Sequence, residues 1–382
     1  MKLGGPRARS DLTDHPAAVP REEAKFESGP ELEPIERAVC ELEHKIRLLD
    51  RVLPTNAAAE RSRLLRTLVS GRVAAPAFTY APTPETPVWQ RQLGELSARL
   101  ESIDHPAARW FAARVEELLV EAELLLARGT PQFQRLACQR YVISDKELED
   151  SEVLAHEWLR EPPSQLPADP IVSDDRRDPR SLWCVLERRI QQSGFPIRLV
   201  VSAELSSAAA AGDGFVAMRS NARYSAEAAE RIAQHELLAH VFPRFHARQQ
   251  RIGLLRVGVR GSGEEEEGRA LLIEQRGGYL DNARRRELAL RHLAASAVRS
   301  GADFEQLVRL LEAHGSSLEA ACDTAFRALR GGGLAREIAY IPAFLRVSEA
   351  FSAAPELERW FERGRATLAF SRALAGGPPP VR

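Results

Sequence analysis

The chain lacks the features that mark disulfide-bonded, secreted and membrane-spanning proteins. Its 382 residues include only four cysteines and no C-x-x-C pair, a pattern typical of free thiols in a reducing compartment. No run of about 18 apolar residues occurs, and the first residues lack the apolar core of a signal peptide. The sequence therefore predicts a cytoplasmic protein that does not span a membrane. The cysteines are Cys40, Cys138, Cys184 and Cys322.

Aromatic residues are scarce, and neither sign of charge is in excess. Aromatic residues make up only 6% of the chain, so we expect a core built from Leu, Ala, Val and Ile. Lys and Arg number 53 and Asp and Glu 54, which gives a formal net charge of -1. This balance argues against nucleic acid or an anionic membrane as a partner. The remaining composition, 44% apolar and 28% charged, is that of an ordinary globular protein.

The order of segments predicts a mainly α protein of the α+β class, divided near its middle. Residues 1–34 are rich in proline and charge, and we expect them to lack fixed structure. A helical N-terminal region is expected over 35–160, followed by a linker over 161–180 that holds five prolines. A second domain is expected over 181–355, and a C-terminal helix with a frayed tail over 356–382.

Apolar spacing places helices and strands within these regions. Steps of three and four predict helices, and two apolar runs separated by an Ala/Gly loop predict a pair of strands. Ser225 is expected to cap the helix that follows it. The expected helices cover residues 35–53, 57–71, 88–103, 107–128, 266–300, 303–329 and 335–352, and the expected strands cover 195–205 and 214–224.

One helix carries a histidine pair with unusual spacing. His235 and Glu236 are followed by His240, five positions after the first histidine, whereas zinc peptidase helices usually read H-E-x-x-H. On an ideal helix an i, i+5 pair diverges by about 140°, so both side chains cannot bind one ion. A turn widened by one residue, as in a π-bulge, would bring them together. The spacing leaves two interpretations, a metal site on a widened turn or two partly exposed helix histidines.

A catalytic zinc site needs a third protein ligand, and the acidic segment "GSGEEEEGRALLIE" offers one. Glu267 begins a helical face that immediately becomes apolar, and burying a carboxylate there is costly unless a positive partner is present. We therefore rank Glu267 first as the third ligand, His246 second and Glu274 third. If no metal binds, the chain is expected to be a helical partner-binding protein.

Three sequence blocks together resemble a known family. "HELLAH", "EEGRALLIE" and "RALRGGGLAREIAYI" are similar to the H-E-x-G-T-H, E-G-L-A and R-G-G-x-x-T-K-D-x-x-Y patterns of the microtubule-associated tyrosine carboxypeptidases. They also resemble bacterial relatives of that family, the flavohaemoglobin expression-modulating proteins with a Q-E-G-L-A motif. "LLDRVLPTNAAAER" and "APAFTY" extend the resemblance, which covers about residues 35–355 in order. We expect a bacterial member.

The resemblance implies a zincin-like catalytic domain and a metallopeptidase with an H-E-x-x-x-H site. It implies one Zn²⁺ per chain, bound by His235, His240 and Glu267. Glu236 then matches the general base. The implied substrate is the C-terminus of a peptide or protein, and the implied reaction is hydrolysis of a peptide bond.

Further candidates lie around the run of three glycines. Tyr340 matches the tyrosine of the third block and is the candidate donor to an oxyanion, with a core tyrosine as the alternative. Arg330, which matches the arginine of that block, and Arg336 are the candidates for binding a terminal carboxylate, because a guanidinium binds both oxygens. Arg219 and Arg223 rank behind them.

The chain departs from the family pattern beside the expected site. Because the expected ligands and base are intact, we expect a zinc-dependent metallopeptidase of the carboxypeptidase type. The alternative is a catalytically silent, metal-binding regulatory or interaction protein, which the bulkier histidine turn favours. The departures are Leu238 and Ala239 for Gly and Thr, Glu266 and Arg269 for Gln and Leu, and Arg336-Glu337 for Lys-Asp.

Overall fold

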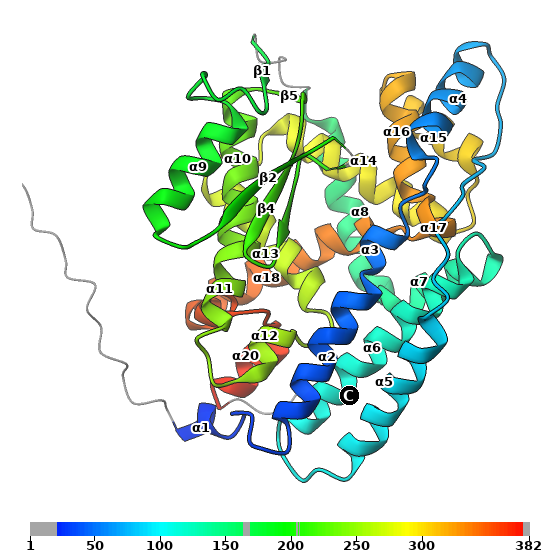
Figure 1. Ribbon diagram of the computed structural model, residues 1–382. Helices are drawn as coiled ribbons and strands as arrows, with labels where there is room; N and C mark the ends of the chain where they lie inside the picture. Colours follow the sequence, from blue (N-terminus) through cyan, green and yellow to red (C-terminus); the bar gives the residue numbers. More distant parts are fainter. Residues whose placement is uncertain (1–20, 163–168, 204, 206, 377–382) are drawn as a thin grey trace, which may run out of the picture.

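A computed structural model describes residues 21–162, 169–203, 205 and 207–376, and it is mainly helical with a small sheet (Figure 1). The predicted mainly α, α+β class is confirmed. None of the described helices is long and apolar enough to cross a membrane. The predictions made for residues 1–20 and for the tail after residue 376 fall outside the described part of the chain.

Helices that pack around one another make up the first part of the chain. The predicted helix over 35–53 ends at Arg47, whose φ of 40° is left-handed, and a separate short helix follows. Leu49 of this short helix is exposed. The bounds are α1 (Arg21–Ala24), α2 (Glu33–Ile46), α3 (Leu48–Arg51), α4 (Ala57–Val69), α5 (Thr86–Glu101), α6 (Ala108–Ala127), α7 (Pro131–Arg140) and α8 (Asp145–Arg160).

The main hydrophobic core extends beyond the predicted N-terminal region on both sides. Phe26 and Leu32, which lie in the segment expected to lack structure, are buried in it. The same cluster contains Trp158 of α8 together with Val298 and Phe344 from the far side of the predicted linker. The helices before residue 161 and those after residue 250 therefore share one core. A second, smaller cluster lies around the sheet and includes residues between 182 and 242.

The small sheet packs with the histidine helix and with the helix that precedes the strands, and these two helices also contact each other. Its strand order is β2-β4-β3, with β2 parallel and β3 antiparallel to β4. The predicted strand pair is present, but the Ala/Gly segment between them, expected as a loop, is itself a strand. The bounds are β1 (Ile171–Val172), α9 (Leu182–Ser193), β2 (Arg198–Ser202), β3 (Ala209–Gly212), β4 (Phe215–Arg219) and β5 (Arg223–Tyr224), with β1 and β5 paired separately.

Two long helices expected in the second half are each divided. The helix predicted over 266–300 breaks at Gly277 and Gly278, and Asp281 caps a new helix by accepting from Arg284 N. The helix predicted over 303–329 breaks at Gly315, whose φ is 78°. Ser225 caps its helix as predicted, accepting from Ala228 N at 3.1 Å.

The remaining helical segments complete the described part of the chain. Their bounds are α10 (Ala226–Gln234), the π-helix η1 (His235–Val241), α11 (Phe242–Ala247), α12 (Gly253–Val257), α13 (Ser262–Arg276), α14 (Asn282–Arg299), α15 (Phe304–Ala313), α16 (Leu318–Ala328), α17 (Arg330–Gly333), the 3-10 helix η2 (Arg336–Ala339), α18 (Tyr340–Ala353), the 3-10 helix η3 (Pro355–Leu357), α19 (Glu358–Arg363) and α20 (Leu368–Leu374).

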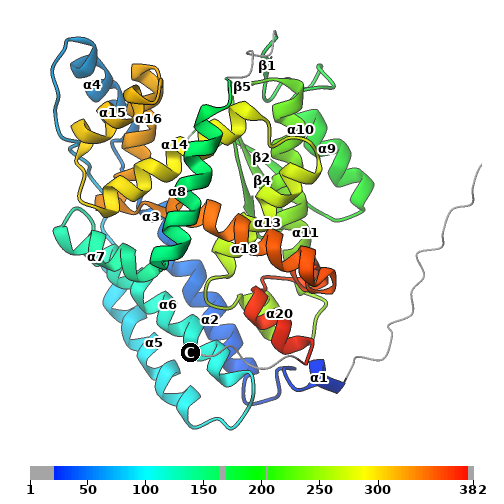
Figure 2. The same cartoon turned by 180° about the vertical axis from the view of Figure 1, so that it is seen from behind.

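Helices α13 and α18 cross near the centre of the molecule in both views (Figures 1 and 2). Their backbones approach closely at Gly268, where an added Cβ would lie 2.5 Å from the carbonyl carbon and oxygen of Ala343. Only glycine permits this approach. The crossing brings Tyr340, at the start of α18, towards Glu267 on α13.

Candidate metal centre

The histidine pair lies on a π-helical turn. Helix α10 widens at His235 into η1, and Phe242 donates its N–H to the carbonyl of Leu237, five residues back. One extra residue per turn brings His235 and His240 to the same side, with ring centroids 5.3 Å apart. The widened turn expected from the i, i+5 spacing is therefore present.

Glu267 on α13 faces both histidines. Its carboxylate oxygens lie 3.6 Å from His235 Nε2 and 4.0 Å from His240 Nε2. One ligand atom from each of the three residues can be chosen so that all lie within 4.8 Å of one another. Among the described residues this is the one group of at least three His, Cys, Asp or Glu side chains with the geometry to hold a metal ion.

Each histidine also has a carboxylate behind it. His235 Nδ1 lies 2.8 Å from Glu274 Oε1, and His240 Nδ1 lies 3.3 Å from Glu266 Oε2. When Nδ1–H is donated to these carboxylates, the Nε2 atom of each ring faces Glu267 and can bind a cation once it carries no proton. Metal-binding histidines are usually oriented in this way, and two imidazoles with one carboxylate form a donor set that zinc accepts. The residues present therefore fit a divalent cation.

Arginines keep the carboxylates of the cluster ionised. Burial alone would raise the pKa of Glu267, but the charge of Arg336 and the hydrogen bond from His235 hold it well below its usual value. Arg336 Nη2 lies 2.9 Å from Glu267 Oε1. Arg284 binds Glu274 at 2.9 and 3.1 Å. Burial alone would raise the pKa of Glu274, but the charge of Arg284 and the hydrogen bond from His235 together lower it to about 2.

The cluster has a negative potential at the imidazoles. Burial lowers the pKa of His235, but its hydrogen bonds with Glu267 and Glu274 outweigh this effect and raise the pKa to about 10. Glu266 is likewise ionised, because the hydrogen bond from His240 and the charge of Arg365 outweigh burial and lower its pKa to about 2. A potential that retains a proton on an imidazole also favours a divalent cation beside it.

Glu236 and Tyr340 retain free polar groups. Glu236 is half-buried and makes no hydrogen bond or ion pair with any described residue. Tyr340 is buried, with the Arg336 guanidinium 5.4 Å from its ring centroid. Its hydroxyl makes no hydrogen bond within the part of the chain that the structure describes. Burial raises the pKa of Tyr340, against the opposing charge of Arg336, so the phenol remains protonated.

The two arginines expected to bind substrate differ in their surroundings. Arg336 is engaged with Glu267, so it contacts an expected metal ligand. Arg330 instead donates Nε to the carbonyl of Arg327 at 3.1 Å and has no carboxylate partner among the described residues. Burial, followed by the charge of Arg327, lowers the pKa of Arg330 to about 10.

The glycine run beside Arg330 packs against the protein itself. An added Cβ at Gly331 would overlap the ring of Phe133, and Gly331 N donates to the hydroxyl of Tyr80 at 2.9 Å. All three glycines have positive φ. Their backbone freedom therefore serves contacts with α7 and the segment before α5.

The lower-ranked ligands take other positions. His246 lies 2.8 Å from the carbonyl of Glu362 and is not part of the cluster. Glu274 supports His235 from behind, a role the sequence reasoning missed. A signal was present, since Glu274 lies seven residues, or two turns, after Glu267 on the same helical face. Glu266, noted only as a departure, likewise supports His240.

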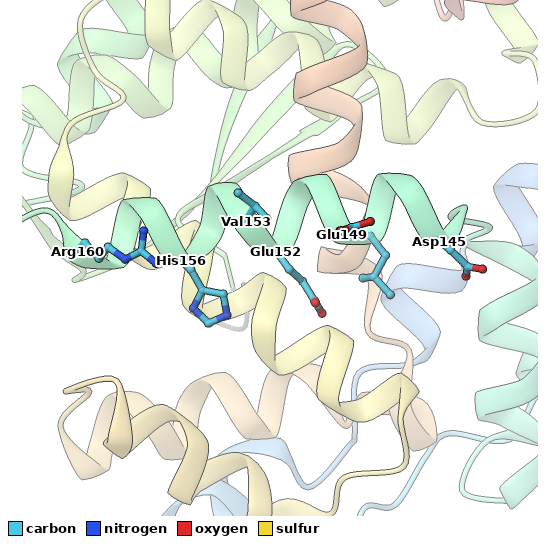
Figure 3. Close-up of a pocket in the computed structure, with 7 residues that line it drawn as sticks. Asp145, Glu149, Glu152, Val153, His156 and Arg160 are labelled. Carbon is cyan, nitrogen blue, oxygen red and sulfur yellow. The ribbon is translucent and has the colours of Figure 1, made fainter.

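A separate hollow of about 410 Å³ runs along α8 (Figure 3). It contains none of the cluster residues. Its lining is mixed in charge, with acidic, basic and apolar side chains along one helix, and no nucleophile is aligned with a base in it. The residues are Asp145, Leu148, Glu149, Glu152, Val153, His156 and Arg160.

Comparisons with known proteins place the chain in a family. No curated protein sequence matches it. Among solved structures, one described as the "putative lipoprotein" from Colwellia psychrerythraea resembles it with a TM-score of 0.42 and 13% identity, covering 90% of this chain and 69% of that chain. A likeness this distant carries no functional information. The model of the microtubule-associated tyrosine carboxypeptidase family matches residues 68–375, most of the chain, and the protein therefore belongs to that family.

Proposed function

We propose that the protein is a zinc-dependent metallopeptidase that removes residues from the C-terminus of a peptide or protein. The observation that carries this proposal is the convergence of His235, His240 and Glu267, with a carboxylate behind each imidazole. Family membership supports carboxypeptidase activity.

Three side chains would hold the cation, and the residues around them would carry the reaction. A bound zinc ion would supply a Lewis acid that activates water and polarises the scissile carbonyl. Glu236, free of other partners, would accept a proton from the attacking water and return it to the leaving amine. The Tyr340 hydroxyl would donate to the carbonyl oxygen as that oxygen gains charge. Arg336 would hold Glu267 in place.

Preference for a chain terminus requires a group that binds the terminal carboxylate. Arg330 is the better candidate of the two expected arginines, because its guanidinium lacks a carboxylate partner while Arg336 is bound to Glu267. A buried, unpaired guanidinium is costly to maintain. An incoming carboxylate would offset that cost with two parallel hydrogen bonds.

The proposal is tested with zinc-loaded protein and peptides that vary in their C-terminal residue. Wild type is expected to shorten at least one peptide from its C-terminus. Glu236→Gln is expected to be slower by about 10²–10⁴-fold while retaining zinc. Glu227→Gln, a change at an exposed acid of α10, is the matched control and should retain full activity.

The competing outcome is a metal-binding protein without peptidase activity. The bulkier turn favours this outcome, because Leu238 and Ala239 stand where the family pattern has Gly and Thr. Fully zinc-loaded wild type that cleaves no peptide in a broad library would reject the peptidase. Protein that binds no stoichiometric metal would reject both.

A further inference from the structure

The π-turn leaves one carbonyl without its regular backbone donor. Within η1 the N–H groups bond five residues back, and the last of these bonds runs from Phe242 to Leu237. The next donor in that pattern would be residue 243, which would bond to the carbonyl of Leu238. Residue 243 is proline and has no N–H. Proline is tolerated there because it begins α11.

Arg269 supplies the missing donor from another helix. Its Nη1 lies 2.8 Å from the carbonyl oxygen of Leu238. Arg269 stands two residues after Glu267 on α13, while Leu238 lies between the two histidines. This one hydrogen bond therefore joins the two elements that carry the three expected ligands.

The surroundings of Arg269 show that an ordinary ion pair does not explain its burial. Its side chain is 6% exposed, and its nearest carboxylate oxygen, on the exposed Glu362, is 4.0 Å away. Its Nε has no hydrogen-bond partner in the described part of the chain. Burial lowers its pKa, only partly opposed by Glu358 and Glu362. Its close contact is the Leu238 carbonyl, so the cost of burying the guanidinium is offset mainly there.

We propose that Arg269 is a positioning residue that keeps the histidine turn in its π form. Without this donor the Leu238 carbonyl is left unsatisfied in a buried turn, which favours rearrangement towards a regular α-turn. Such a rearrangement rotates His235 and His240 apart. The inference rests on the proposed metal site and adds a requirement to it. Positions 238 and 269, both departures from the family pattern, are thus joined by one hydrogen bond.

The test measures metal affinity and ligand geometry without any substrate. Zinc dissociation constants are measured by chelator competition, and the visible absorption of Co²⁺-loaded protein reports the coordination geometry. Arg269→Met is expected to weaken zinc binding about 10- to 100-fold and to change the Co²⁺ spectrum. Arg269→Lys retains a donor and should lose less. Arg276→Met, a change on the exposed side of the same helix, is the matched control.

A double-mutant cycle identifies the carbonyl as the target. Pro243→Ala restores a backbone N–H at the position from which the π pattern would reach Leu238. In that background, Arg269→Met should weaken zinc binding by a clearly smaller factor than in the wild type. Equal factors in the two backgrounds would overturn the proposal, because the arginine would then act elsewhere.

The remaining outcomes separate this inference from the proposed function. If the wild type binds zinc and Arg269→Met has the same zinc affinity and Co²⁺ spectrum, the positioning role is rejected. The peptidase proposal then still stands. Wild type that binds no zinc would reject both. If Arg269→Met does not fold, the comparison of Arg269→Lys with wild type, alone and with Pro243→Ala, gives the same decision.

Discussion

Two carboxylates behind the imidazoles distinguish this cluster from an accidental pair of histidines. Glu274 and Glu266 each contact the Nδ1 atom of one histidine, and each has arginine neighbours that keep it ionised. An isolated histidine pair needs no such support. At the scale of single residues, the cost of burying these charges is explained if they orient ligands for a cation.

Glu274→Gln tests this support directly. The substitution keeps the shape of the side chain but removes the charge that fixes the His235 ring, so zinc affinity is expected to fall about 10- to 100-fold. Glu266→Gln should cost less, because its contact with His240 is 3.3 Å against 2.8 Å for Glu274 and His235. Chelator competition measures both. Glu305→Gln, at a glutamate of α15 paired with the exposed Arg309, should leave affinity unchanged.

Arg330→Met tests terminal-carboxylate binding. A charged hydrogen-bonded contact of this kind contributes enough that its loss should raise KM for free-acid peptides about 10- to 100-fold. The kcat should change less than KM. Peptides with an amidated C-terminus should be poor substrates for the wild type and show no further loss in the variant. An equal loss on acids and amides would assign Arg330 a structural role.

At the scale of elements, the site depends on how closely α13 and α18 cross. Gly268 is the contact point, and it follows Glu267 directly in the sequence. Arg336, just before α18, binds the Glu267 carboxylate, and its guanidinium lies over the ring of Tyr340 at the start of α18. The position of the third ligand, Glu267, therefore depends on the spacing between α13 and α18.

Gly268→Ala should damage both the fold and the site. The added methyl group has no room beside the Ala343 backbone, so we expect a loss of about 1–3 kcal/mol in the free energy of unfolding. Zinc affinity should fall as well, because α13 must move. Gly94→Ala, in the middle of α5 with open space around it, should instead stabilise by about 0.5–1 kcal/mol. Urea unfolding of metal-free protein measures both changes.

At the scale of the whole molecule, polar contacts also join helices from both sides of the predicted linker. His292 of α14 is fully buried and pairs with Ser151 of α8 through Nε2 at 3.0 Å. Arg365, near the C-terminus, binds Glu43 of α2 and lies 3.4 Å from Glu266. The N-terminal helices thus support the orientation of His240 from a distance.

The buried His292 makes stability depend on pH. Burial lowers its pKa from 6.5 to about 4. Because the unfolded chain takes up this proton first, stability is full above pH 6.5 and is lost as the pH falls towards 4, by about 3 kcal/mol for this group. His292→Gln should flatten the pH dependence over this window, and His44→Gln, at an exposed histidine, should not. Identical pH slopes in wild type and His292→Gln would contradict the assignment.

The sequence predicted the parts of the site that follow from local geometry. Two histidines five apart require a widened turn if they share an ion, and Glu267 begins an apolar face. The two-turn spacing from Glu267 to Glu274 was a usable signal for Glu274. The contacts of Glu266 and Arg269 depend on how α13 packs against η1, which a single sequence does not specify.

The helix and strand bounds that were predicted wrongly have similar physical causes. The strand at Ala209–Gly212 was missed because Ala and Gly have low strand propensity, and pairing with β4 overrides it. The division after Arg276 had a visible signal in Gly277 and Gly278, outweighed by the apolar periodicity around it. Propensity and spacing describe single segments, whereas these outcomes depend on their neighbours.

Diffraction data collected on both sides of the zinc absorption edge, from crystals of zinc-loaded protein, test the central claim most directly. We predict one strong anomalous peak per chain, bonded to Nε2 of His235, Nε2 of His240 and a carboxylate oxygen of Glu267. The absence of a peak there, or a peak bound to other residues, would contradict the metal centre and the peptidase built on it.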